Sequence, residues 1–184
     1  SFQQLLSEKV KFIALTYVSN AIGTINPVDA YIAEAHHWNI PILIDAAQAV
    51  SNRPIDVQPL DCDFLVFSGH KMFGPTGIGI LYAKQHLLEQ MPPYQGGGDM
   101  IRSVSFAKTT YAPPPHKFEA GTPPIAGAIG LGQAIRYVQQ FDWKDIEHHE
   151  FDLLNYASEQ LQKNEHLELI GMPKAQAGIL SFIV

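Results

Sequence analysis

The tetrapeptide Ser68-Gly69-His70-Lys71 holds the side chains best suited to chemistry in this sequence. It follows an apolar, β-rich run at residues 64–67, so Lys71 comes directly after an expected buried strand. A lysine there must be paired, solvated or used as an amine, because a buried ammonium is costly. The Ser68 hydroxyl and the His70 imidazole suit a phosphate or another anion. An amine beside an anion site is what a Schiff-base lysine that holds pyridoxal phosphate requires, although the tetrapeptide alone favours a simple surface lysine.

A carboxylate ends a second apolar run. Residues 41–44 are typical of a short parallel strand covered on both faces, and Asp45 comes at its carboxyl end. Ligands of open α/β sheets bind at such ends, where a carboxylate can pair with a protonated pyridine nitrogen. Gln48 can reach the same ligand if residues 46–48 turn helically. Asp45 could also cap a helix over residues 46–50, and the two roles are compatible. The distance along the chain to Lys71 allows a crossover and one more strand, which predicts that Asp45 and Lys71 lie on one edge of the sheet.

Periodic apolar patterns predict the elements that position these groups. Residues 10–17 indicate a strand that places Asn20 at its carboxyl end, so Asn20 is a site candidate or else a turn asparagine. A short turn before residues 78–82 favours a strand antiparallel to 64–67. Helices are expected over residues 28–38, 86–91, 125–141 and 145–164. The fold class is therefore α/β, with a mixed, mostly parallel sheet and flanking helices.

Several residues have simple structural interpretations. Asn26 and Thr122 are expected to cap the helices over 28–38 and 125–141, although a helix N-terminus is also an anion site. Cys62, the single cysteine, is expected to be a small buried hydrophobe. His36 and His37 are adjacent, as are His148 and His149. Neighbouring side chains on a helix point about 100° apart, so the two histidines of a pair cannot bind one metal ion together, and no metal site is predicted. The glycines at 96–98 could cradle a phosphate, but no nucleotide P-loop motif follows them.

Composition narrows the function classes. The chain has 184 residues, of which 46% are hydrophobic, and this is enough for one sizeable core. A net charge of −6 gives no electrostatic reason to expect nucleic acid or an anionic membrane as a partner. No apolar run approaches the roughly 18 residues of a membrane span. A single cysteine excludes an intrachain disulfide and is compatible with a reducing, cytoplasmic location.

Several segments together carry a resemblance to a known family. They are residues 18–24, 44–49, 60–64, 67–79, 96–101 and 118–123. In these segments the chain resembles SufS-type cysteine desulfurases, which are fold-type I pyridoxal phosphate enzymes of the class V aminotransferase superfamily. The similarity extends over almost the whole chain in the family's order. Family members are longer, and the chain ends in a strand-like run, so we expect an internal fragment with residues 1–135 in the large cofactor domain. Residues 136–184 would form a linking helix and the start of a small α/β domain.

The resemblance implies a role for each candidate. Lys71 would hold pyridoxal phosphate as a Schiff base and shuttle protons, while Asp45 pairs with the pyridine nitrogen. The remaining assignments are Gln48 to the ring oxygen, Asn20 near that oxygen or the substrate, Ser68 and His70 to the phosphate, and Thr122 to the phosphate of the other subunit. The last implies a homodimer with shared active sites.

The implied activity converts L-cysteine to L-alanine and leaves the sulfur as an enzyme persulfide. The sulfur would pass to an acceptor protein, for example in iron–sulfur cluster assembly. The resemblance places the nucleophilic cysteine downstream of Val184, so the chain alone is expected to be inactive.

Three alternatives remain at this point. The first is another class V member, such as a selenocysteine lyase, an aminotransferase or an epimerase, since these share Asp45 and Lys71. The second is a non-catalytic dimerisation or scaffold piece. The third, an NAD-type Rossmann protein, is disfavoured because no Gly-x-Gly-x-x-Gly follows an early strand.

Overall fold

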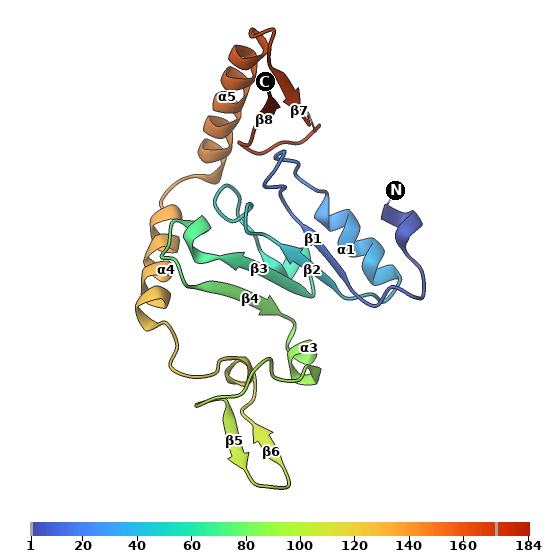
Figure 1. Cartoon of the computed structure of the whole chain (residues 1–184), viewed down its shortest axis with the longest axis vertical. Coiled ribbons are helices and arrows are strands. Elements are labelled where there is room, and N and C mark those ends of the chain that lie inside the picture. Colours follow the sequence, from blue (N-terminus) through green and yellow to red (C-terminus); the bar gives the residue numbers. More distant parts are fainter. Residues whose placement is uncertain (1, 172) are drawn as a thin grey trace.

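Three parallel strands and one antiparallel strand form the main sheet of the computed structural model, which describes residues 2–171 and 173–184 (Figure 1). The strands are β1 (Ile13–Thr16), β2 (Ile42–Asp45), β3 (Phe64–Ser68) and β4 (Gly79–Ala83), and they lie side by side in that order. β1 to β3 are parallel, whereas β4 runs antiparallel to β3. The predicted mixed, mostly parallel sheet is therefore confirmed, including the antiparallel strand after the short turn.

The strand register brings three carboxyl ends together. Thr16, Asp45 and Val66 are neighbours across β1, β2 and β3. The ladder continues past the strands, because the Tyr17 amide donates to the Asp45 carbonyl at 2.8 Å. The segments that follow these strands therefore start from one edge of the sheet, which we call the carboxyl edge.

Helix α1 (Val28–His37) covers the sheet and buries Val28, Ile32 and Ala35. These side chains join Ile42 and Ile44 of β2 in the hydrophobic core. The predicted cap by Asn26 is wrong, since Pro27 occupies the N-cap position and no side chain caps the helix. Asn26 instead donates from Nδ2 to the Thr16 carbonyl at 2.8 Å, which ties the helix approach to the end of β1.

Short elements connect the larger ones. They are η1 (Phe2–Leu5), α2 (Val57–Leu60), η2 (Gly69–Met72), α3 (Gln85–Gln90), β5 (Ile101–Val104), β6 (Thr109–Tyr111) and η3 (His116–Phe118). β5 and β6 form a hairpin that projects from the body of the molecule (Figure 1). α3 matches the predicted helix over 86–91 within one residue at each end.

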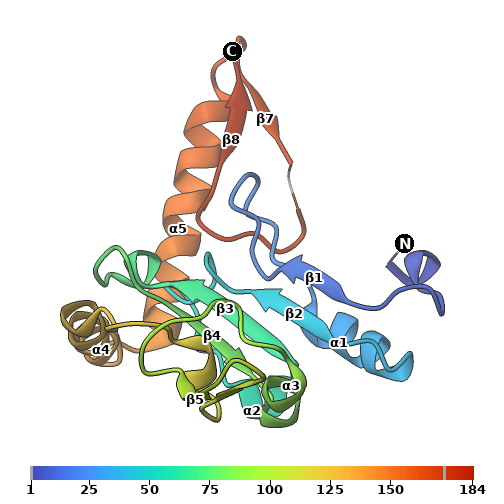
Figure 2. The ribbon, with the colours of Figure 1, turned by 60° about the horizontal axis from the view of Figure 1, so that its bottom comes forward.

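Two longer helices lead away from the sheet. α4 (Ile125–Val138) is followed by α5 (Trp143–Gln162), which extends to a small antiparallel pair, β7 (Glu168–Ile170) and β8 (Ser181–Ile183) (Figures 1 and 2). Leu154 is the buried residue of α5. Among the described residues, no helix is both long and apolar enough to cross a bilayer. The domain division at residue 135 stays a prediction.

The predicted cap of α4 by Thr122 is wrong. The N-cap residue is Pro124, with no side-chain cap bond, and Thr122 is exposed. A capping oxygen must reach the amide of the second or third helical residue. Thr122 lies two residues before the N-cap, and Pro123 and Pro124 offer no amide hydrogen of their own.

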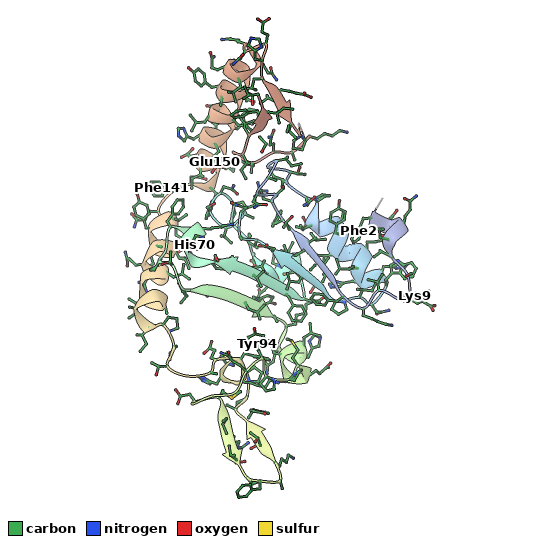
Figure 3. The ribbon with its side chains drawn as sticks, in the orientation of Figure 1. Phe2, Lys9, His70, Tyr94, Phe141 and Glu150 are labelled. Atoms are coloured by element: carbon green, nitrogen blue, oxygen red, sulfur yellow. The ribbon has the colours of Figure 1, made fainter. Side chains whose placement is uncertain are left out.

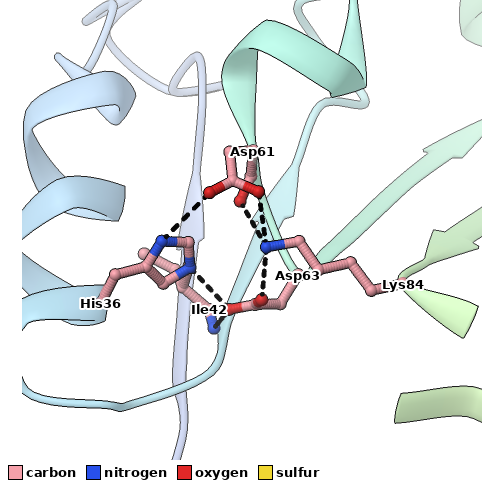
Figure 4. Close-up of polar contacts among 5 residues, drawn as sticks. All are labelled: His36, Ile42, Asp61, Asp63 and Lys84. Carbon is pink, nitrogen blue, oxygen red and sulfur yellow. Dashed lines mark hydrogen bonds and ion pairs between the residues drawn. The ribbon is translucent and has the colours of Figure 1, made fainter. Parts of the chain in front are cut away.

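A polar cluster holds the opposite edge of the sheet (Figure 4). Asp63, just before β3, accepts from the Ile42 amide at 2.9 Å, lies 3.0 Å from His36 Nε2 and lies 3.0 Å from Lys84 Nζ. Asp61 lies 2.7 Å from the same Lys84 Nζ and 3.5 Å from His36 Nδ1. The cluster thus ties the last turn of α1 and the ends of three strands together, away from the carboxyl edge.

Candidate active site

The turn after β3 carries the predicted catalytic lysine. Ser68 ends β3, and Lys71 lies in η2. The Gly69 amide donates to the Ile78 carbonyl at 2.8 Å. A Cβ on Gly69 would lie 2.8 Å from Ile78 Cγ2, so only glycine fits this approach. Packing against Ile78 therefore sets the tight turn that leads into Lys71.

The polar side chains of this turn are Ser68, His70 and Lys71. Ser68 and Lys71 are half-buried and His70 is exposed where η2 follows β3 (Figure 3). Within residues 2–171 and 173–184, none of the three side chains makes a hydrogen bond or an ion pair. A half-buried amine without an internal partner is available to a ligand, since a partner for its charge must come from elsewhere.

Asp45 ends β2 and begins a turn. Its Oδ1 accepts from the Ala47 amide at 2.9 Å. The Ala49 and Val50 amides both donate to the Ala46 carbonyl, so residues 46–50 form turns rather than the helix that a capping role predicted. Within the described part of the chain, Oδ2 makes no hydrogen bond. Asp45 Oδ1 thus stabilises the turn that carries Gln48, and Oδ2 is available to accept a hydrogen bond from a ligand.

Asn20 lies in the loop after β1. Ser19 Oγ accepts from the amides of Ala21 and Ile22 at 3.2 and 3.3 Å, and the Ser19 amide donates to the Thr24 carbonyl at 2.9 Å. These bonds fold the loop back on itself and leave Asn20 exposed. Among the described residues, the Asn20 side chain makes no hydrogen bond, so it is available to a ligand.

The predicted site residues fall into two groups. The first follows the carboxyl ends of three neighbouring parallel strands and consists of Asn20, Asp45, Gln48, Ser68, His70 and Lys71. The shared edge predicted for Asp45 and Lys71 is what the sheet provides. Thr122 lies outside this group, before α4, and its expected role concerns a second subunit. An amine, a carboxylate, amides, a hydroxyl and an imidazole on one edge fit an anionic, nitrogen-containing ring, and each individual role stays a prediction.

Cys62 is not part of this edge. Its side chain is fully buried in the hydrophobic core. Burial raises the pKa of the Cys62 thiol to about 11, so little thiolate forms near neutral pH. This agrees with the prediction of a buried hydrophobe. In the described ranges no three His, Cys, Asp or Glu side chains gather in a way that could hold a metal ion.

Sequence reasoning missed one set of contacts at the carboxyl edge. Gln176 Nε2 donates to the Ile22 carbonyl, in the Asn20 loop, at 3.3 Å. The Ala177 amide donates to the Gly23 carbonyl at 2.8 Å. The partners are about 154 residues apart in the chain, and no local pattern around Gln176 marks it.

Comparison with known proteins places the chain among characterised sequences. Residues 1–184 match the model of the aminotransferase class-V family. A cysteine desulfurase of Serratia proteamaculans is 52% identical over 97% of this chain and 44% of its own length. One of Synechococcus elongatus is 49% identical over the whole chain and 29% of its own length. The crystal structure of the Escherichia coli cysteine desulfurase CsdA, in its S-sulfonic acid form, superposes with a TM-score of 0.92 at 38% identity, over 98% of this chain and 45% of that one. The chain thus spans less than half the length of these relatives.

Proposed function

The chain belongs to the class V aminotransferase family, and on this premise we propose that it supplies the cofactor-binding part of a pyridoxal phosphate-dependent cysteine desulfurase. The proposed reaction converts L-cysteine and an enzyme thiol into L-alanine and an enzyme persulfide. The carbon–sulfur bond of cysteine breaks, a sulfur–sulfur bond forms, and the thiol protons balance the proton added at the alanine methyl. No external oxidant or reductant is needed.

One observation carries the proposal. The polar side chains that such a cofactor needs follow the ends of three adjacent parallel strands, and those of Ser68, His70 and Lys71 have no other partner among the described residues. Relatives about 50% identical to the chain over nearly its full length are cysteine desulfurases. Class V aminotransferases and cysteine desulfurases are pyridoxal phosphate enzymes, and the bound cofactor supplies an electron sink.

The chain's own residues would divide the work. Lys71 would attach the cofactor through Nζ and move a proton at the reacting carbon. Asp45, through the oxygen not used by the Ala47 amide, would hold a proton on the pyridine nitrogen. The other contacts would be Gln48 to the ring oxygen, Asn20 to that oxygen or the substrate, and Ser68 with His70 to the phosphate.

The finer points of the proposal concern the whole protein. We place it with the SufS-type enzymes, which deliver sulfur to an acceptor protein for uses such as iron–sulfur cluster assembly in the cytoplasm. Thr122 would reach the phosphate in the neighbouring subunit of a homodimer, and its exposure before α4 leaves it accessible for that contact. Because Cys62 is buried and its pKa is raised, another cysteine would receive the sulfur.

The lysine assignment has a direct test. Borohydride reduction of the full-length protein with pyridoxal phosphate, followed by peptide mass spectrometry, should place the cofactor on Lys71. Lys71→Ala should lose both this adduct and alanine formation from cysteine, and Lys71→Arg should do the same because it keeps the charge without a reactive amine. Attachment to another lysine would contradict the assignment. Alanine formed from selenocysteine but not from cysteine would identify a selenocysteine lyase instead.

A further inference from the structure

A segment near the end of the described chain is hydrogen-bonded to the Asn20 loop. Four bonds join residues 175–181 to residues 21–25. The Ile25 amide donates to the Ala175 carbonyl at 3.0 Å, and the Ala177 amide donates to the Gly23 carbonyl at 2.8 Å. Gln176 Nε2 and Ser181 Oγ donate to the carbonyls of Ile22 and Ala21. We call residues 175–181 the clasp.

The fit between clasp and loop is close. Gly23 has a φ of 69°, and a Cβ on it would lie 2.9 Å from the Ala177 carbonyl oxygen. Gly171, just before the clasp, has a φ of 67°, and its Cβ would lie 2.9 Å from Ile22 Cβ. Both glycines are therefore needed where the two segments touch. A side chain at either glycine would force the loop and its neighbouring segment apart.

Asn20 belongs to the loop that the clasp contacts. Its neighbour Ser19 is held by hydrogen bonds within the loop, and the Ala21 carbonyl accepts from Ser181 of the clasp, while Asn20 itself is exposed. The placement of the Asn20 amide at the carboxyl edge thus depends on two supports. One of them comes from the segment that leads into β8 (Figure 2).

Gln176 joins both sides of this contact with one amide. Its Nε2 donates to the Ile22 carbonyl at 3.3 Å and to the Ile179 carbonyl, within the clasp, at 2.9 Å. Both donor hydrogens are used, so the side chain fixes the loop and the clasp together. We propose that Gln176 is a positioning residue that holds the Asn20 loop and thereby places Asn20 against a ligand bound at the carboxyl edge. This rests on the proposed function, because it assigns that ligand as pyridoxal phosphate or the substrate attached to it.

The first test needs no cofactor. Gln176→Met keeps the length of the side chain and removes both donors. Hydrogen exchange of the full-length protein should become about three- to tenfold faster at the Ile25 amide and its loop neighbours, as expected for the loss of one or two neutral hydrogen bonds. The control is Gln162→Met, at an exposed glutamine of α5 whose side chain bonds to no described residue. Unchanged hydrogen exchange in Gln176→Met would refute this inference and leave the proposed function standing.

The second test measures the absorption of bound pyridoxal phosphate. In the protein loaded with pyridoxal phosphate, Asn20→Ala should move the pH midpoint of the visible absorption band. Gln176→Met should move it in the same direction, and the double variant should move it no further than Asn20→Ala does, because the two residues act as one unit. A Gln176→Met midpoint equal to the wild type, or shifts that add, would overturn the inference. A wild-type protein that takes up no pyridoxal phosphate would refute the proposed function instead.

Discussion

Asp63→Ala is expected to destabilise the protein far more than Asp61→Ala, although both carboxylates contact the same lysine and the same histidine. Both lie within 3.0 Å of Lys84 Nζ and within 3.5 Å of a His36 nitrogen. The two side chains differ in exposure, which is 10% for Asp63 and 61% for Asp61. Only the Asp63 carboxylate also accepts a backbone amide, that of Ile42. Comparing Asp63→Ala with Asp61→Ala therefore separates the effect of burial on stability from the effect of charge.

The magnitude follows from what each substitution leaves behind. Removing the Asp63 carboxylate leaves the Ile42 amide without its acceptor. It also takes the more buried of two carboxylates from His36 and from Lys84, whose side chain is only 23% exposed and which keeps Asp61 alone. Breaking a buried charged pair costs about 3–5 kcal/mol, so we expect a loss of about 3 kcal/mol for Asp63→Ala. Asp61 is largely exposed, and surface pairs contribute about 0–1 kcal/mol. We therefore expect less than about 1 kcal/mol for Asp61→Ala.

The pH dependence has a defined sign. Burial alone would raise the pKa of Asp63, but the hydrogen bonds from Ile42, Lys84 and His36 outweigh it and lower this pKa below 3.8. The contribution of Asp63 is therefore complete above pH 3.8 and is lost as the pH falls through the lowered value. The pKa of Lys84 is raised above 10.5, because its bonds to Asp61 and Asp63 outweigh its own desolvation, so its contribution is lost only above that pH.

The assay is urea unfolding of the full-length protein, followed by circular dichroism, for the wild type and both alanine variants. The midpoint for Asp63→Ala should lie well below that for Asp61→Ala at neutral pH, and the gap between Asp63→Ala and the wild type should narrow below about pH 4. Equal midpoints for the two variants would refute the reasoning, since burial would then not decide the strength of this cluster. A gap that widens on acidification would contradict the direction given for the Asp63 pKa.

Two further predictions concern Gly69, in the turn that carries Lys71, and the buried Cys62. Gly69→Ala should cost about 1–3 kcal/mol and weaken pyridoxal phosphate uptake, because its Cβ would lie 2.8 Å from Ile78 Cγ2. Gly132→Ala, with nothing within 4 Å of the new Cβ, is the control, and equal uptake in both variants would count against the tight turn as a support of Lys71. Cys62 should resist alkylation at neutral pH, and Cys62→Ala should keep persulfide formation at a stability cost of about 1 kcal/mol, measured by labelling and urea unfolding. Rapid labelling of Cys62 in the folded protein would contradict its burial.

Local sequence pattern was sufficient for the sheet and for one part of the site. The apolar run before Asp45 and the β-rich run before Ser68 each predict a strand that ends in a polar residue, and the short turn after Lys71 predicts an antiparallel partner. Strands of this kind pair in parallel with their carboxyl ends at one edge, so the shared edge of Asp45 and Lys71 follows from rules about neighbouring elements. The buried state of Cys62 follows from its place beside a core strand.

Capping was less predictable from sequence. Asn26 and Thr122 are both good capping residues by type, yet a proline holds the N-cap position in each case. Residue type gives the capacity to cap, whereas the position at which the chain enters the helix decides whether an amide is within reach.

Contacts between distant segments were decided by tertiary structure alone. The sequence by itself determined which side chains end the parallel strands, because strand patterns and turns are local. It could not determine that Gln176 holds the Asn20 loop or that Asp63 gathers His36 and Lys84, because hydrogen bonds between segments leave no periodic trace in either segment. Those contacts exist only once the sheet has brought the segments together, and burial in the folded chain then sets their strength.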